Sequence, residues 1–373
     1  MASVAVSEAR SPKEVLSFIK FPLGLYQEDP NYCPMPIFEQ KKMFFPEKNP
    51  FFKDAEVKYF LARQDGRITG RIASIVNRRH NEAHADGAGF FGFFECENDQ
   101  ATAKKLLDTA ALELKKAGMQ RMRGPMNFST NEECGFLLEG GEPGAPMIMM
   151  PYNPAYYNSL MEKYGMQKAK DLLAFIAGVH PPEKMFRVAA MAEKRGFKTR
   201  NINLKKLRDE LAIFRDVYNS AWKDNWGFLP ITPEEVDDMA KRLKGVLVEE
   251  LTAIVEAPDG EPVGFLGLVP DLNQALVELK AKLTPIRIIK AIHRFRKIDA
   301  LRLMLLGVKD GWRGKGIESL LMKKGVEGIR KSGDKYKKLE FSWILEDNLP
   351  VIKLSEICGG TPYRRYRIYE KEI

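Results

Sequence analysis

Residues 301–330 have the sequence LRLMLLGVKDGWRGKGIESLLMKKGVEGIR. The apolar run Leu301–Val308 predicts a buried strand, and the apolar spacing in Glu318–Arg330 predicts an amphipathic helix. The turn Arg313-Gly314-Lys315-Gly316 joins them. Such a turn suits phosphate, because glycines let the backbone approach closely and a helix N-terminus presents unpaired N–H groups. A tight strand-to-helix turn that binds nothing is the alternative.

The same order of elements surrounds this stretch and recurs earlier in the chain. In the second half, Leu251–Glu256 and Val263–Val269 flank a Pro-Asp-Gly turn and predict a hairpin, and the apolar segment Leu339–Leu345 predicts a strand after the helix. In the first half, Val57–Ala62 and Ile68–Val76 flank an Asp-Gly turn in the same way. An internal duplication explains both patterns.

The first half continues with an apolar run at Gly89–Phe94 and a helical pattern over Ala101–Ala117, and the two halves meet near Val179-His180-Pro181-Pro182. We therefore expect an α/β fold (an α+β mixed sheet) in two tandem domains, residues 1–178 and 184–373. The second domain carries a basic helical insert at 272–298.

Length and composition limit the class of protein. A chain of 373 residues with 45% hydrophobic and 29% charged residues fits two globular domains and excludes global disorder. The four cysteines include no Cys-x-x-Cys pair, which favours buried thiols in a reducing compartment and no structural zinc. No apolar run approaches the ~18 residues of a membrane span. These features predict a cytoplasmic protein.

The basic residues gather toward the C-terminal end of the sequence. From Lys280 to Ile373 there are 23 Lys and Arg against 11 Asp and Glu, whereas the whole chain has a net charge of +9. A basic region can bind nucleic acid, an anionic membrane or a phosphate-bearing cofactor. Its position around the glycine-rich turn favours the cofactor.

Together, the strand, the turn and the helix resemble the GNAT superfamily of N-acyltransferases, whose signature is Gln/Arg-x-x-Gly-x-Gly/Ala. Arg313 and Gly316 match its first and fourth positions, while Glu318 stands where the family has Gly or Ala. The resemblance implies that acetyl-CoA or a longer acyl-CoA is the cosubstrate and that no metal is required. It implies the following coenzyme-binding residues: Leu306, Val308, Arg313, Gly314, Lys315, Gly316, Ile317 and Asn348.

The resemblance also implies direct attack of an amine on the thioester, between strands that splay apart near Leu306–Val308 and Ser342–Ile344. The attack requires a neutral amine and hence a base. Glu346 is the first candidate and Glu340 the second, and a solvated surface carboxylate is the alternative for Glu346. Ser355 occupies the position at which the family often has a catalytic Tyr, and we include it among the candidate catalytic residues.

In the first half the phosphate turn is absent, since Glu95, Glu97 and Asp99 occupy the corresponding junction. The first copy therefore resembles a degenerate GNAT domain. We expect the acceptor to bind at the loop that carries Trp222, Asn225 and Trp226, although these indoles could equally cover an edge of the core.

The basic insert contains a helix start at Thr284-Pro285, followed by Ile288, Ile289, Ile292 and Phe295 among Lys and Arg. This composition is typical of a helix at an anionic membrane surface, and a helix packed on the sheet is the alternative. The membrane interpretation predicts peripheral contact with the inner membrane through residues 284–298 and a lipidic amine acceptor. Otherwise we expect a small-molecule amine.

Three hypotheses follow. The leading one is an acyl-CoA-dependent N-acyltransferase that transfers an acetyl or longer acyl group to a primary amine. The second is a non-catalytic tandem GNAT protein that binds an acyl carrier or an anionic membrane, which Glu318 and the missing Tyr favour. Nucleic-acid binding is third, because the segment Tyr363–Arg367 interleaves aromatic residues with arginines, but a terminal strand accounts for the same pattern.

Overall fold

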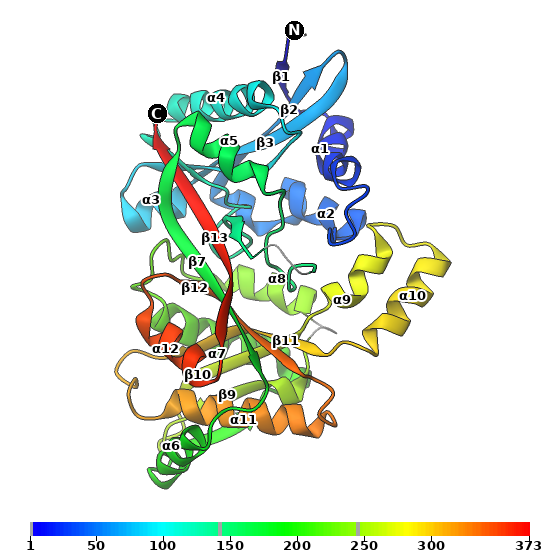
Figure 1. Ribbon diagram of the computed structural model, residues 1–373. Helices are drawn as coiled ribbons and strands as arrows, with labels where there is room; N and C mark the ends of the chain where they lie inside the picture. Colours follow the sequence, from blue (N-terminus) through cyan, green and yellow to red (C-terminus); the bar gives the residue numbers. More distant parts are fainter. Residues whose placement is uncertain (1–2, 141–143, 244–246) are drawn as a thin grey trace. The chain divides into compact units, whose positions relative to one another are not determined.

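A computed structural model describes residues 3–140, 144–243 and 247–373. The chain forms two compact units, each built from separate segments (Figure 1). Unit 1 contains Met1–Leu172, Asn273–Arg296 and Arg364–Ile373, and unit 2 contains Leu173–Leu272 and Lys297–Tyr363. The division of the sequence into 1–178 and 184–373 describes a repeat along the chain and stays a prediction.

Unit 1 begins with a small strand and two helices and continues with a meander of long strands. Its elements within the first 172 residues are β1 (Ala5–Glu8), α1 (Pro12–Leu25), α2 (Ile37–Phe44), the 3-10 turns η1 (Pro46–Lys48) and η2 (Pro50–Lys53), β2 (Ala55–Gln64), β3 (Arg67–Asn77), α3 (Arg78–His84), β4 (Ala88–Cys96), α4 (Gln100–Lys116), β5 (Arg121–Gly124), β6 (Phe136–Glu139), α5 (Tyr156–Tyr164) and the first part of β7 (Gln167–Gly178).

The predicted first hairpin is confirmed as β2 and β3, which are antiparallel. Asp65 and Gly66 both have positive φ, 51° and 79°, as a two-residue turn between twisted strands requires. The predicted helix is α4, whose Leu106, Leu107 and Leu114 are fully buried in the core of unit 1. Leu112 of the same helix is 54% exposed, so the apolar face is narrower than the sequence pattern indicated.

Unit 2 repeats this arrangement. Its elements are the end of β7, α6 (Glu183–Lys194), β8 (Lys198–Asn201), η3 (Leu204–Lys206), α7 (Leu207–Ala221), α8 (Pro233–Leu243), η4 (Glu249–Leu251), β9 (Thr252–Glu256), β10 (Pro262–Pro270), β11 (Ala300–Val308), α11 (Ile317–Lys331), β12 (Lys338–Leu345), α12 (Leu349–Ile357) and the start of β13 (Thr361–Glu372). All the elements that were predicted between residues 251 and 373 are present.

Each unit has a mixed sheet with a parallel pair joined by a helix. In unit 1 the strands β1, β2, β3 and β4 are successively antiparallel, and β4 is parallel to β5. In unit 2 the strands β8, β9, β10 and β11 are antiparallel, and β11 is parallel to β12. Helices α4 and α11 make the two crossovers. The expected α/β fold with duplicated order is confirmed.

The last strand of each half of the sequence has part of its length in either unit. β13 runs beside β5 of unit 1, with Tyr369 opposite Gly124 and Glu372 opposite Arg121. β7 in turn neighbours β12 of unit 2. Each unit is therefore completed by a strand that the other half of the sequence provides.

The basic insert forms α9 (Asn273–Leu276), η5 (Val277–Leu279) and α10 (Pro285–Phe295), and it belongs to unit 1 although it follows β10 in the sequence. Asn273 fixes its start, because its side-chain amide donates to the Pro146 carbonyl at 2.9 Å. Thr284 is the N-cap residue of α10, as predicted, but its side chain makes no capping hydrogen bond.

Candidate active site

The parallel strands β11 and β12 diverge partway along their length. Their register pairs run from Ala300 opposite Lys338 to Leu303 opposite Phe341, and no later β11–β12 pair forms within the part of the chain that the structure describes. β11 continues past this point paired with β10 as far as Val308, after a bulge opposite Gly267 and Leu268. The expected divergence, with 306–308 on one strand and 342–344 on the other, is therefore present.

The turn between β11 and α11 has the backbone that only glycine adopts at low cost. Gly314 and Gly316 have φ of 74° and 85°. A Cβ on Gly316 would also lie 3.1 Å from Cγ1 of Val188 in α6. Gly316 is the N-cap of α11, and no side chain of the described residues caps this helix. The N–H groups that begin at Ile317 are thus left for a ligand or water.

The same place in unit 1 is closed by the chain itself. Asp99 caps α4, and its carboxylate accepts hydrogen bonds from the backbone N–H groups of Ala101 at 3.3 Å and Thr102 at 2.8 Å. The hydroxyl of Thr102 also donates to it, which holds the pKa of Asp99 below its usual value. An ionised carboxylate at this terminus would repel a phosphate. This contrast supports the prediction that unit 1 lost its phosphate site.

The end of α7 holds the glycine-rich turn in place. Arg313 donates from Nη2 to the Ala221 carbonyl at 2.5 Å, and Lys223 pairs with Asp310 at 2.7 Å. The hydrogen bond from Lys223 lowers the pKa of Asp310. Lys315 lies over the Trp312 ring, 4.3 Å from its centroid, and remains exposed. The turn therefore presents cations on a fixed backbone.

The loop after α7 brings one predicted acceptor residue to β11. The Trp222 indole lies against Gly307, where an added Cβ would be 2.2 Å from its Cζ3 atom, and it stacks on Tyr218 at 4.9 Å. Asn225 follows in the next turn, and its backbone N–H donates to the Trp222 carbonyl at 2.9 Å. Trp226 is partly buried beside it. Of the three predicted acceptor residues, Trp222 is the one whose side chain contacts β11, at Gly307.

A buried polar cluster lies where β11 and β12 begin to diverge. Arg302 and Glu340 are register partners, and the Arg302 Nε atom lies 3.9 Å from Glu340 Oε1 and 2.8 Å from Ser342 Oγ. The hydroxyls of Ser342 and Tyr363 both donate to the Glu340 carboxylate. Glu340 is fully buried, whereas Tyr363, in β13, is partly exposed. We call these four residues the Glu340 cluster.

The Glu340 cluster faces the same side of the sheet as α7. Phe265 of β10 packs on Phe214 of α7, with ring centroids 5.1 Å apart. Because side chains alternate along a strand, Val269 lies on that face too, and Arg302 is its register partner in β11. Trp222 covers Gly307 on the same face, since Gly307 pairs with Phe265. The cluster and the loop that carries Trp222 therefore share one side of unit 2.

The other predicted residues lie at the far end of β12. Glu346 follows the strand and is partly exposed. Asn348 is the N-cap of α12, and its Oδ1 atom accepts from the Val351 N–H at 3.4 Å. Ser355 is fully buried, and its hydroxyl donates to the Val351 carbonyl of its own helix at 2.9 Å. This position gives Ser355 a structural hydrogen bond, and we assign it no part in the reaction.

Sequence reasoning missed Arg302 and Tyr363. Tyr363 was noticed only as part of an aromatic and basic tail, and it lies in a different strand from Glu340, so no fixed spacing connects them. The available signal was Glu340, a carboxylate within an apolar strand, because a buried carboxylate needs hydrogen-bonding or charged partners.

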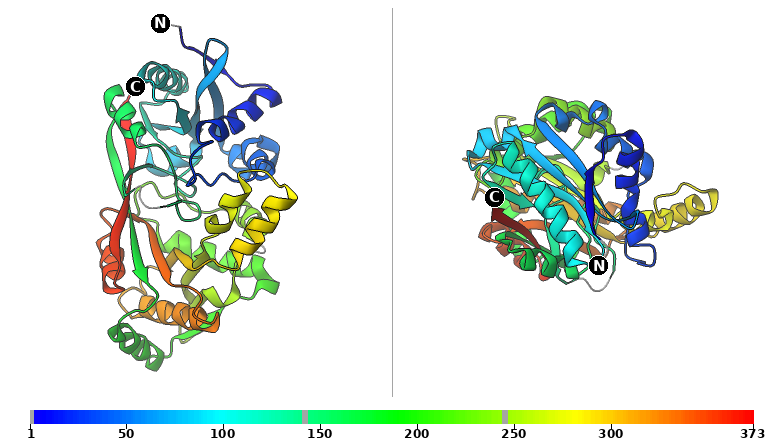
Figure 2. Two further views of the ribbon diagram at one scale, coloured as in Figure 1. Left: turned by 45° about the vertical axis from the view of Figure 1, so that its right-hand side comes forward. Right: turned by 90° about the horizontal axis from the view of Figure 1, so that it is seen from above.

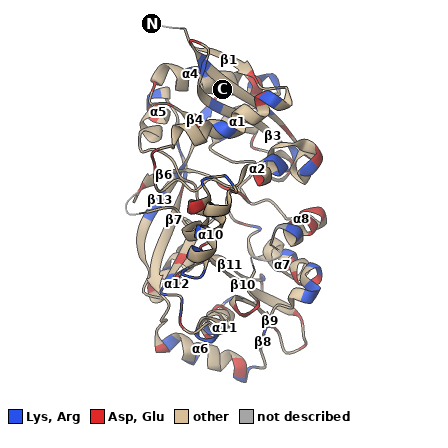
Figure 3. Ribbon diagram, turned by 90° about the vertical axis from the view of Figure 1, so that its right-hand side faces the viewer, with Lys and Arg blue, Asp and Glu red and all other residues tan. Residues whose placement is uncertain are grey.

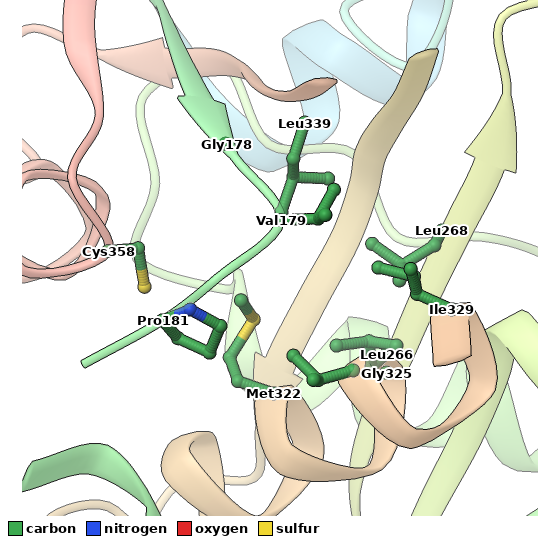
Figure 4. Close-up of a pocket in the computed structure, with 11 residues that line it drawn as sticks. Gly178, Val179, Pro181, Leu266, Leu268, Met322, Gly325, Ile329, Leu339 and Cys358 are labelled. Atoms are coloured by element: carbon green, nitrogen blue, oxygen red, sulfur yellow. The ribbon is translucent and has the colours of Figure 1, made fainter. Parts of the chain in front are cut away.

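On the α11 face, a small apolar pocket lies inside unit 2 (Figure 4). Met322, Gly325 and Ile329 of α11 form one wall, and Leu266, Leu268 and Leu339 come from the sheet. Cys358 closes one side, and burial raises the pKa of its thiol to about 11. The lining is apolar, but the cavity of about 10 Å³ is too small to hold an acyl chain.

Comparisons with known proteins identify the family. No protein-family model matches the chain. It is 33% identical over 383 residues to the bacterial ceramide synthase of Caulobacter vibrioides, covering 100% of this chain and 98% of that protein. It is 32% identical to protein YghO of Escherichia coli over 96% of this chain and 93% of that one.

Solved structures show the same fold. A tandem GNAT protein from the clavulanic acid biosynthesis pathway superposes with a TM-score of 0.58 at 11% identity, covering 99% of this chain and 98% of that one. A GCN5-related N-acetyltransferase from Sphaerobacter thermophilus gives a TM-score of 0.51 at 14% identity, over 99% and 95%. The chain therefore has the tandem GNAT fold. It belongs to the family that includes the bacterial ceramide synthase of Caulobacter vibrioides.

Two further observations concern the described residues. No group of three or more His, Cys, Asp and Glu among them is placed to hold a metal ion. None of their helices combines the length and apolarity needed to cross a bilayer.

Proposed function

We propose that unit 2 is the catalytic unit and that it transfers an acyl group from acyl-CoA to the primary amine of a long-chain, lipidic acceptor. The contrast between the two crossover helices carries this proposal, since α4 is capped by Asp99 whereas α11 begins at an uncapped glycine beside two cations. The diverging strands β11 and β12 provide the second requirement, a place for the thioester along β11.

The coenzyme would be held mainly by backbone groups. The N–H groups of the Gly314–Ile317 turn face the pyrophosphate, with Arg313 and Lys315 as counter-charges. The backbone of Leu306 and Val308 binds the pantetheine arm where β12 has moved away, and Asn348 lies at the exit of β12. Acyl-CoA supplies an activated thioester carbonyl. Glu318 lies in the first turn of α11 and must point away from the phosphates.

The chain's own residues must accept a proton from the amine. The amine nitrogen forms the new C–N bond, the C–S bond breaks, and the nitrogen loses one proton. We propose that Tyr363, which is partly exposed, takes this proton while it passes its own to the buried Glu340. The thiolate of the departing coenzyme takes up a proton from solvent, and Glu340 later returns its proton by the same path. Glu346 remains the competing base.

The lipidic acceptor is supported by the named relative. A ceramide is the N-acyl derivative of a long-chain amino alcohol, so a bacterial ceramide synthase at 33% identity favours an acceptor of that class. Because such substrates reside in membranes, the proposal includes work at a bilayer surface, peripheral to the inner membrane.

The direct test is calorimetric titration of acetyl-CoA and palmitoyl-CoA, followed by mass spectrometry of a sphingoid base incubated with each. We expect both coenzymes to bind, palmitoyl-CoA more tightly, and an N-acyl product to form. Arg313→Ala should weaken binding about tenfold or more, because it removes a charge-assisted contact. Arg330→Ala, at the other end of α11, is the control.

Two results would contradict the proposal. If neither coenzyme binds, unit 2 has no coenzyme site. If both bind but no amine is acylated, the protein is a non-catalytic acyl-CoA or acyl-carrier binder, which is the competing hypothesis.

A further inference from the structure

Helix α10 exposes its apolar side to solvent. No residue of this helix is buried. Ile286 is 69% exposed, Ile289 67%, Ile292 54% and Phe295 50%. These four residues repeat every three positions, so they form one broad stripe along the helix. Helices of globular proteins turn such a stripe toward the core, and an exposed one marks an interaction site.

The polar side of α10 holds the helix to its own unit. Arg287 donates from Nη1 to the Leu279 carbonyl at 2.9 Å, and Arg294 pairs with Glu278 at 3.2 Å. These two arginines are seven residues apart, which is about two helical turns, so they share one side of the helix. Both of their partners belong to η5, in the connection that precedes α10. The attachment therefore leaves the side that carries the isoleucines exposed. Figure 2 shows α10, in yellow, at the periphery of the ribbon.

Cations surround the apolar stripe and acids are absent from it. Between Leu279 and Ile298 the sequence has seven Lys and Arg and no Asp or Glu. Lys282, Lys290, Arg296 and Lys297 are all exposed. Blue segments in Figure 3 mark the basic residues of α10. Leu283, just before the helix, adds another apolar side chain that is 52% exposed. A protein partner that covered these isoleucines would have to supply carboxylates, whereas an anionic bilayer offers apolar depth and negative headgroups together.

We propose that α10 is a membrane-docking helix, which inserts Ile286, Ile289, Ile292 and Phe295 among the headgroups of an anionic phospholipid bilayer. The helix lies in the plane of the interface, because its eleven residues are too few to span the hydrocarbon. Lys282 and Lys290 bind lipid phosphates beside it. The docking surface stands on its own structural observations, and it deepens the proposed function by naming the surface through which a lipidic acceptor is reached.

The test is flotation of the full-length protein with vesicles of phosphatidylcholine, with and without phosphatidylglycerol, in the absence of any substrate. We expect binding to the anionic vesicles, weaker binding to the neutral ones, and release by salt. Lys290→Glu should lower the partition coefficient by about fivefold or more, since each basic residue near the surface contributes about that factor.

Ile292→Asp should abolish binding, because it places a charge in the inserted stripe. Leu112→Asp is the matched control, since Leu112 on α4 has the same 54% exposure but has acids (Asp108, Glu113) as well as bases (Lys115, Lys116) near it in the helix. A tryptophan at position 289 (Ile289→Trp) should shift its emission to the blue when anionic vesicles are added.

The proposal is overturned if the protein fails to float with anionic vesicles, or if Ile292→Asp and Leu112→Asp bind equally. It is also overturned if Ile292→Asp converts a dimer into a monomer without changing vesicle binding, which would make α10 a contact between two copies of the chain. Acylation of a detergent-dispersed sphingoid base, measured separately, reports on the proposed enzyme activity and is expected to be unchanged in Ile292→Asp.

Discussion

The indole of Trp222 occupies the space that a side chain at Gly307 would need, because a Cβ there would be 2.2 Å from Cζ3 and 2.4 Å from Cη2 of the ring. Gly307 lies in the part of β11 beyond its divergence from β12, and Trp222 is the C-cap residue of α7. The pair joins the acceptor loop to the strand that we expect to hold the thioester.

We expect Gly307→Ala to lower the free energy of unfolding by about 1–3 kcal/mol, since the added methyl group must displace a half-buried indole. Gly267→Ala, in the neighbouring strand β10, is the control, because the nearest atom to its Cβ would be 3.6 Å away. Urea denaturation measures both. In the double variant Trp222→Ala/Gly307→Ala, the loss of unfolding free energy should be smaller than the sum of the losses in the two single variants. Strict additivity would show that the two residues do not compete for the same space.

The phosphate turn can be tested with two side chains of the same size. Gly314 has φ of 74°, and no atom lies within 4 Å of a Cβ built there, so Asn should be accommodated at a small cost. Gly314→Asp adds a negative charge next to the proposed pyrophosphate. Calorimetry should find CoA binding at least tenfold weaker in Gly314→Asp than in Gly314→Asn. Equal affinities would place the phosphates elsewhere.

The proton path predicts that Tyr363→Phe lowers kcat by about a hundredfold or more, because general base catalysis is typically worth that much. The phenylalanine keeps the packing, so the melting temperature reports whether the fold is intact. Tyr336→Phe, which alters a buried tyrosine of the same unit, should leave kcat unchanged. If Tyr363→Phe is fully active and Glu346→Gln is inactive, Glu346 is the base and the Glu340 cluster is structural.

A buried histidine predicts a pH dependence of stability in unit 1. Burial lowers the pKa of His80 to about 4, although Asp86 at 3.1 Å opposes this and His84 and Arg123 add to it. The unfolded chain, with a histidine pKa near 6.5, therefore takes up a proton before the folded one does. The contribution of His80 to the free energy of unfolding is therefore fully present above pH 6.5 and is lost as the pH falls toward 4.

Between pH 7 and pH 5 this histidine should remove about 2 kcal/mol of stability. His80→Gln should lose that part of the slope in urea titrations at several pH values. His293→Gln alters an exposed histidine of α10 and should follow the wild-type slope. A His80→Gln variant with the wild-type slope would contradict the lowered pKa.

Local patterns in the sequence predicted the elements of this fold well, because Asp-Gly turns and apolar periodicity act over a few residues. The turn at Asp65-Gly66 and the helix α11 are examples. The exchange of β7 and β13 was not predictable in this way. Which sheet each strand joins depends on the partners that the fold brings beside it, and nothing within the strand's own sequence specifies them.

The sequence predicted those parts of the candidate site that consist of a local backbone turn. It predicted less well the parts that depend on contacts between side chains from different strands. Gly314 and Gly316 were predicted because a backbone with positive φ favours glycine, which is visible in the sequence. The partnership of Glu340 with Tyr363 depends on strands that meet only in the fold. The sequence pattern also did not predict whether α10 is buried, since its sequence suits a covered helix as well as the exposed one observed.

The exchanged strand β13 has a consequence for synthesis of the chain. A ribosome completes β5 long before β13, and at ~5–20 residues per second the interval is roughly ten to fifty seconds. During that time the sheet of the first half lacks its neighbour for β5, and an unpaired edge can pair with another nascent chain. Domains ordinarily fold one after another as they emerge, whereas here the earlier half must wait for the last strand to be translated.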